Sequence, residues 1–284
     1  LGDHNVQAVA GYTWEDSNNE SMGMSNSNFT FDNMKYNNIG AGSYLAEGKA
    51  NMYSGKSLSK LVSVFGRVNY NWKDLIMASA SLRYEGSTKF GANSKWGYFP
   101  AASVAWEMAN MPFLQDHGRI VQSLKPRVSY GVTGRSGFGS YQSLSTYSTR
   151  NSYFFDGQWV TGYAPSLNAN PGLAWEKLVS MNIGVDFVLL NSRIRGSIDL
   201  FDRQSQDLLY NYTAPQPPYI YSNILVNVGT TQNRGIEVSV DGDIFSTKDF
   251  TWTMGANWST GNTIMKNLSN NIYKASYVDM GSKG

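Results

Sequence analysis

The residue types that most often perform catalysis or bind metals are scarce in this chain and far apart. His4 and His117 are the only histidines among 284 residues, and there is no cysteine. Zinc and similar metals are usually held by imidazole and thiolate groups, so a metal site here would have to consist mostly of carboxylates. We therefore expect no metal centre and no cofactor.

Two short segments resemble parts of catalytic motifs but lack residues that those motifs require. The tripeptide GKS at 55–57 matches the end of a phosphate-binding loop, but Ala50 stands at the position of that loop's first glycine. Residues 134–138 resemble the turn that carries a nucleophilic serine, but Phe138 stands where that turn needs glycine. We expect no enzymatic activity from either segment.

Neighbouring carboxylates are the remaining candidates for catalysis, because a pair of them can act as general acid and general base. They fall into two groups, Asp199, Asp202 and Asp207 in the first, and Glu237 and Asp241 in the second. The simpler interpretation is that they line a wet surface and form ion pairs with arginines such as Arg83, Arg193 and Arg195. The sequence therefore predicts no catalytic residue.

The segment 134–177 offers binding chemistry instead, because it is rich in aromatic and amide side chains. A ring can stack on an apolar face of a ligand while amides hydrogen-bond to its hydroxyl groups. The candidates for ligand contact are Trp159, Tyr153, Tyr141 and Asn151. The alternative is that these rings pack the segment against its neighbours.

The framework for these side chains is indicated by polarity that alternates residue by residue between Ser63 and Trp106. In the range 63–72 the even-numbered residues are apolar or glycine, whereas Arg67, Asn69 and Asn71 occupy odd-numbered positions. A period of two places each set on one face of a β-strand. About ten tilted residues are enough for a strand to cross the hydrocarbon layer of a bilayer. This segment therefore predicts strands that can span a membrane.

The same alternation predicts an all-β fold of about nine strands. These are Asn5–Trp14, Ser63–Trp72, Leu75–Tyr84, Tyr98–Glu107, Leu124–Thr133, Leu178–Val188, Arg193–Tyr212, Asn227–Asp241 and Phe250–Ser259. One face carries no charge, and Trp and Tyr gather at strand ends, where the interfacial girdles of membrane barrels lie. The charges of the other face, which include Arg127, Asp186 and Asp199, nearly cancel. This balance favours a neutral ligand.

The predicted connections alternate in length along the chain. Short ones, such as 73–74 and 189–192, alternate with long ones, such as 15–62 and 134–177, and only 108–123 is too long for its place. Outer-membrane barrels have short periplasmic turns and long extracellular loops, whereas compact soluble domains rarely contain such long connections. Because an odd number of strands would leave an unpaired edge in lipid, we expect a contiguous piece of a larger antiparallel transmembrane β-barrel.

Composition is consistent with a barrel segment. Charged residues make up only 15% of the chain, and the mean hydropathy is −0.36. Half-polar strands explain a low hydropathy in a barrel, and we find no run of eighteen apolar residues that would form a membrane helix. A net charge of +2 gives no indication of a nucleic-acid partner.

Seven segments, spread over about residues 60 to 260, match the pattern of one family in the same order. They are FGRVNYNW (65–72), ASASLRYEGSTKFG (78–91), KWGYFPAASVAW (95–106), LKPRVSYGVTG (124–134), NPGLAWEK (170–177), GSIDLFD (196–202) and NRGIEV (233–238). On these segments the chain resembles SusC-like TonB-dependent outer-membrane transporters of Bacteroidetes. Departures at Gly172, Ala174 and residues 230–231 concern barrel and loop packing and leave this resemblance intact.

The resemblance implies a plugged barrel of 22 strands, of which residues 1–284 would be a partial barrel domain. The plug domain, the signal peptide and the TonB-contacting segment are expected to lie outside this chain. Such transporters sit in the lipid of the outer membrane and import glycan oligomers, less often peptides. A SusD-like surface lipoprotein acts as their lid, and the TonB-ExbB-ExbD complex supplies energy.

Two other functions are compatible with the same residues. An outer-membrane barrel can serve adhesion or protein secretion without TonB, and a soluble carbohydrate-binding β-protein also alternates in polarity. A plug domain encoded upstream would distinguish import from the first alternative. Stability without detergent would indicate the second.

Overall fold

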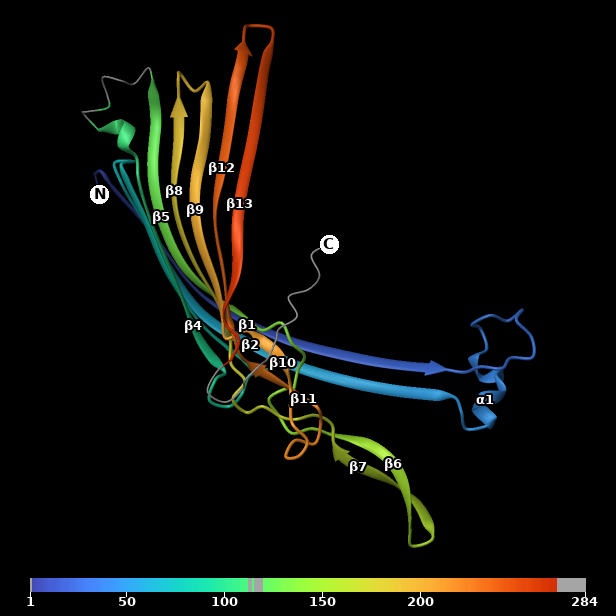
Figure 1. Ribbon diagram of the computed structural model, residues 1–284. Coiled ribbons are helices and arrows are strands. Elements are labelled where there is room, and N and C mark those ends of the chain that lie inside the picture. The colour runs from blue at the N-terminus through green and yellow to red at the C-terminus, as the bar shows by residue number, and fades with distance from the viewer. Residues whose placement is uncertain (1, 112–113, 115–119, 270–284) are drawn as a thin grey trace. The chain divides into compact units, whose positions relative to one another are not determined.

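The computed structural model of the chain describes residues 2–111, 114 and 120–269, which lie mainly in β-strands (Figure 1). The strands of its main sheet are β1 (His4–Ser25), β2 (Asn51–Trp72), β3 (Ile76–Ser87), β4 (Trp96–Trp106), β5 (Val121–Arg135), β8 (Glu176–Leu189), β9 (Ile194–Gln206), β12 (Thr230–Ser246) and β13 (Thr251–Asn267). These nine strands follow one another in chain order across the sheet. Within the described part of the chain, no helix has the length and apolar character to cross a membrane.

Two small hairpins lie outside the main sheet. One pairs β6 (Tyr147–Phe155) with β7 (Gln158–Pro165), and the other pairs β10 (Leu209–Thr213) with β11 (Asn223–Asn227). Both belong to the long connections, between β5 and β8 and between β9 and β12 respectively. The connection from which we expected ligand contacts, 134–177, therefore contains regular structure.

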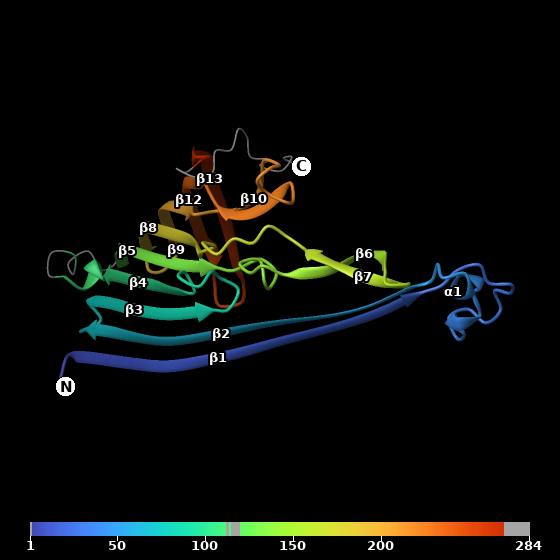
Figure 2. The ribbon, with the colours of Figure 1, turned by 90° about the horizontal axis from the view of Figure 1, so that it is seen from below.

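The main sheet is antiparallel from β2 to β13, and Figure 2 shows its strands lying side by side. One continuous cross-strand row consists of Arg67, Ser81, Ala101, Gly131 and Ser180. The next row consists of Val68, Ala80, Ala102, Tyr130 and Met181. Because side chains alternate between faces, the first row lies on a polar face and the second on an apolar face. The predicted alternation is confirmed.

The apolar face is exposed to the surroundings of the chain. Val68 and Val104 are each 47% exposed and Ile198 is 43% exposed. Tyr84 stacks on Trp96 and Tyr98, with ring centroids 4.7 Å and 4.5 Å apart, near the end of β3. A continuous exposed apolar face of this size needs an apolar environment, because soluble monomers rarely expose one.

The chain divides into two compact units, Leu1–Trp14 with Leu61–Gly284, and Glu15–Lys60. In the second unit, ion pairs of 2.7 Å (Lys56–Glu20) and 3.4 Å (Lys60–Asp16) join the outer parts of β1 and β2. The segment 26–50 of this unit contains a 3-10 turn (Ile39–Ala41) and a short helix, α1 (Ser43–Ala46). Hydrogen bonds from Lys49 and Ser43 to Glu47 lower the pKa of that carboxyl.

Several predicted boundaries are wrong. The expected connection 15–62 is mostly strand, because β1 continues to Ser25 and β2 begins at Asn51. These outer strand parts are largely exposed, and polar residues predominate in 15–21 and 54–60, so no regular alternation marks them. The expected strand 193–212 is divided at Asp207, which has a positive φ of 54°. The expected strand 227–241 begins instead at Thr230, after Gly229 with a φ of 89°.

Short turns join the strands at one end of the first unit. Lys73 and Asp74 have positive φ values of 55° and 53°, which is the backbone of a two-residue hairpin turn. The β8–β9 connection consists of residues 190–193, and its first three residues also have positive φ. The longer connection at this end begins with a 3-10 turn (Met108–Asn110), and its residues 112–113 and 115–119, including His117, lie outside the described residues.

Candidate functional site

Residues 168–176, which we call the clasp, join the two long connections of the first unit. The Asn168 side-chain amide donates to the carbonyl oxygens of Tyr221 and Asn223, at 2.6 Å and 2.9 Å. The Asn170 amide donates to the carbonyl oxygen of Leu225 at 2.8 Å. Asparagine side chains thus bind the backbone of the segment that contains β11. Such bonds hold an irregular segment in place without a regular ladder.

The clasp also binds the β3–β4 connection. The Trp175 indole N–H donates to the carbonyl oxygen of Lys95 at 3.0 Å, and the Gly91 N–H donates to that of Leu173 at 2.9 Å. A Cβ atom at Gly91 would lie 1.7 Å from the carbonyl oxygen of Pro171, so only glycine fits there. Three connections that are distant in sequence are therefore held together by one segment.

Apolar residues of the clasp are buried against β4 and the β3–β4 connection. Phe90, Trp175 and Phe99 are 1%, 4% and 8% exposed. Trp175 contacts both phenylalanines, with ring centroids 4.2 Å (Phe90) and 5.3 Å (Phe99) apart. Leu173 is fully buried as well. The sequence of the NPGLAWEK segment indicates only a family resemblance. Its role in joining loops is not predictable from local patterns, because its partners are 53 to 80 residues away in sequence.

The β6–β7 hairpin carries three of the four residues predicted to contact ligand. Trp159 and Tyr153 are 73% and 53% exposed, and Asn151 is exposed where the pairing register shifts. Trp159 meets Phe154 edge to face across the hairpin, with ring centroids 5.6 Å apart. Tyr141 lies outside this hairpin, is half-buried and has a positive φ of 70°. Ligand contact by these residues stays a prediction.

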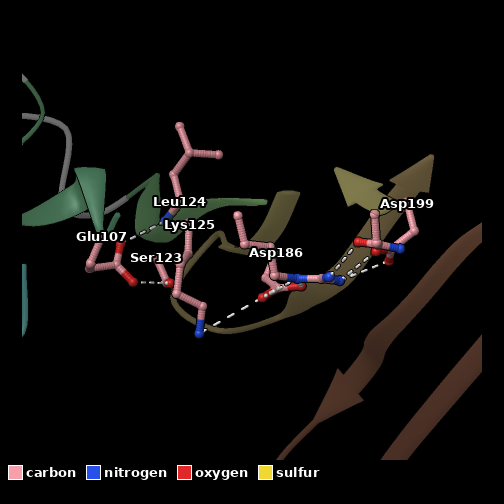
Figure 3. Close-up of polar contacts among 8 residues, drawn as sticks. Glu107, Ser123, Leu124, Lys125, Asp186 and Asp199 are labelled. Carbon is pink, nitrogen blue, oxygen red and sulfur yellow. Dashed lines mark hydrogen bonds and ion pairs between the residues drawn. The ribbon is translucent and has the colours of Figure 1, made fainter. Parts of the chain in front are cut away.

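The polar face carries a group of charged side chains on β5, β8 and β9 (Figure 3). Arg127 forms ion pairs with Asp186 at 3.1 Å and with Asp199 at 2.7 Å, and it donates to the Asn182 side chain at 3.0 Å. Lys125 lies 3.8 Å from Asp186. Charge-assisted bonds of this kind join three neighbouring strands.

Glu107 lies at the end of this group, at the start of the connection that follows β4 (Figure 3). Its carboxylate accepts hydrogen bonds from the Ser123 hydroxyl at 2.6 Å and from the backbone N–H of Leu124 at 2.9 Å. It also accepts one from the N–H of Ala109, at the start of the 3-10 turn. The carboxylate thus fixes the connection after β4 to the beginning of β5.

Among the candidate carboxylates, Asp199 and Asp202 form ion pairs, but with arginines other than the expected ones. Asp199 pairs with Arg127, and Asp202 accepts hydrogen bonds from Gln232 at 2.7 Å and from Arg234 at 2.8 Å. The expected partners bind elsewhere, Arg195 to Asp243 and Arg83 to Glu85. Asp207 lies at the strand break. In the described ranges, no three acidic or histidine side chains are placed to hold a metal ion.

Comparison with known proteins identifies the family. Residues 2–281 match the model of the family described as TonB dependent receptor-like, beta-barrel. The chain is 31% identical to TonB-dependent receptor P3 of Formosa agariphila over 94% of this chain and 26% of that protein. It is 32% identical to TonB-dependent receptor SusC of Bacteroides thetaiotaomicron over 78% of this chain and 22% of that protein.

Solved structures show the same fold. The structure of the RagAB peptide transporter matches with a TM-score of 0.83 at 24% identity, over 94% of this chain and 29% of that chain. The chain spans about a quarter of the length of the curated relatives that it matches. The sheet has one polar face and one exposed apolar face, as the wall of a membrane-spanning barrel does. The chain belongs to the TonB-dependent receptor-like β-barrel family and forms part of an outer-membrane β-barrel of SusC type.

Proposed function

We propose that this chain supplies wall and extracellular loops to a SusC-like active importer of oligosaccharides or similar nutrients. The observation that carries the proposal is the similarity to the receptor named SusC, which extends over 78% of this chain. The polar face supports it, because its serine and asparagine side chains offer donors and acceptors to a hydroxylated molecule.

The same proposal includes partners. A SusD-like surface lipoprotein would cover the extracellular end of the barrel, and the TonB-ExbB-ExbD complex would supply energy through parts of the protein outside this chain. The name "TonB-dependent receptor" of the relatives supports the second partner. The relatives are named as receptors and transporters, which supports a role without catalysis.

Peptides are the second candidate cargo. The structures that match with a TM-score of 0.83 are those of a protein described as a peptide transporter. Their 24% identity supports only the fold, so the cargo has to be measured. A passive barrel for adhesion or secretion is the competing function.

The test is uptake by cells that carry or lack the full-length gene. Cells would be supplied with labelled oligosaccharides in one series and labelled peptides in another. We expect uptake of one cargo class to require the gene, and to stop when the proton gradient is dissipated. Gene-dependent surface adhesion or secretion, without any energy-dependent uptake, would contradict the import function.

A further inference from the structure

A hollow on the polar face lies between Phe65, Arg67, Arg83 and Phe99. Arg83 is opposite Phe65 on one side and opposite Phe99 on the other, so these three form one cross-strand row. In the adjacent row Arg67 is followed by Ser81, Ala101 and Gly131. The large side chains of the first row therefore lie beside the small side chains of Ser81, Ala101 and Gly131, and this difference in side-chain size creates the hollow.

The row that borders the hollow is held in position. Arg83 forms an ion pair with Glu85, donates to the Thr13 hydroxyl at 3.5 Å and lies 5.9 Å from the centre of the Phe65 ring. The Phe65 ring rests on Gly11, where a Cβ atom would lie 2.4 Å from the ring. The border is thus ordered before any ligand arrives, which lowers the entropic cost of binding.

The clasp contacts this border at Phe99. Phe99 is 8% exposed and packs edge to face against Trp175, with ring centroids 5.3 Å apart. The hollow therefore lies directly beside the segment that joins the long connections.

Arg67 carries the charge that the hollow leaves available. The guanidinium of Arg83 is paired with Glu85, and that of Arg127 with Asp186 and Asp199. Arg67 is exposed and forms no ion pair within the described ranges. The charges of the whole face nearly cancel, but the side chain of Arg67 provides a local positive charge in the hollow. A guanidinium fork matches the two oxygens of a carboxylate.

We propose that this hollow binds a carboxylate group of the imported molecule, with Arg67 as the donor. The Phe65 ring contacts the apolar part of the ligand, and the Ser81 hydroxyl and the Asn69 amide bind its polar groups. The inference rests on the proposed import function and specifies the cargo as acidic. An acidic sugar and an acidic peptide both offer this carboxylate.

The experiment measures binding to the purified full-length protein by calorimetry. One pair of probes is trigalacturonic acid and galactotriose. The other is acetyl-Ala-Ala-Asp-Ala-Ala-amide and the same peptide with Asn in place of Asp, so the carboxylate is the only charge. The variants are Arg67→Gln and, as a matched control, Arg234→Gln, whose side chain binds Asp202 outside the hollow. Heat-modifiable migration on gels confirms that each variant barrel is folded.

We expect the wild type to prefer the acidic member of one pair, and that pair identifies the source of the carboxylate. Arg67→Gln should weaken acidic-probe binding about tenfold and leave the neutral probe unchanged, because one charge-assisted interaction is lost. Arg234→Gln should bind like the wild type. No preference for either acidic probe, or an equal loss for acidic and neutral probes in Arg67→Gln, would overturn the inference. Energy-dependent uptake, measured separately in cells, would still support import in that case.

Discussion

Asn227 and Ala174 exchange two hydrogen bonds of 2.8 Å each, although 53 residues separate them in the chain. The Asn227 amide donates to the Ala174 carbonyl oxygen and accepts from the Ala174 N–H, so it replaces a backbone partner. It donates also to the carbonyl oxygen of Asp207 at 3.0 Å. This single side chain therefore joins the clasp to both ends of the β9–β12 connection.

Replacing Asn227 by Ala should loosen the long connections without unfolding the wall. Three hydrogen bonds are lost and backbone groups near Ala174 are left unpaired, at a cost of about 1–3 kcal/mol. Limited proteolysis of the full-length protein should then cut faster within 207–229 and 136–167. Asn211→Ala, an exposed change on β10, is the control and should digest like the wild type. Equal protection of the two variants would show that the clasp does not depend on this side chain.

The two faces of the sheet should respond differently to a charge. Val104→Arg places a cation on the apolar face and should cost about 2–4 kcal/mol, whereas Ser103→Arg faces the polar side and should cost much less. The measurement is the free energy of unfolding in lipid vesicles by urea titration. Similar costs for these neighbouring positions would mean that the faces are assigned wrongly.

Arg127 should stabilise the wall by neutralising two carboxylates. Arg127→Met removes the guanidinium paired with Asp199 and leaves Asp186 with the more distant Lys125, 3.8 Å away, and Glu237 is already opposite Asp199 on β12. We expect a loss of about 1–3 kcal/mol in the free energy of unfolding, part of which a second change, Asp199→Asn, should restore. A double variant no more stable than Arg127→Met would argue against coupling of these two side chains.

Trp159 should affect cargo uptake and not barrel assembly. Its ring is 73% exposed on the β6–β7 hairpin, so Trp159→Ala removes little packing. We expect lower uptake at an unchanged yield of folded protein in the outer membrane. Tyr36→Ala, which removes an 85% exposed ring in the second unit, serves as the control. Uptake that is equally unaffected in both variants would leave the hairpin without a role in cargo contact.

Local sequence was sufficient to predict the wall. Side chains alternate between faces with a period of two, so Val68 and Asn69 indicate their faces without knowledge of any partner strand. Turn residues such as Lys73 and Asp74 limit the strands for the same local reason. The prediction that Trp159 contacts ligand also rests only on the types of nearby residues. The structure places three of the four candidate residues on one hairpin.

Local patterns were not sufficient where both sides of a strand are wet or where a contact is distant. The outer parts of β1 and β2 are mostly polar and lack a regular alternation, so the pattern predicts a loop there. The partners of Arg127 lie on two other strands, and Asn227 reaches Ala174 across 53 residues. The hollow beside Arg67 exists because register places Ser81, Ala101 and Gly131 in one row. The sequence alone thus determined the strands and their faces, because that information is local, whereas the clasp and the hollow depend on strand register and loop packing, which only the tertiary structure decides.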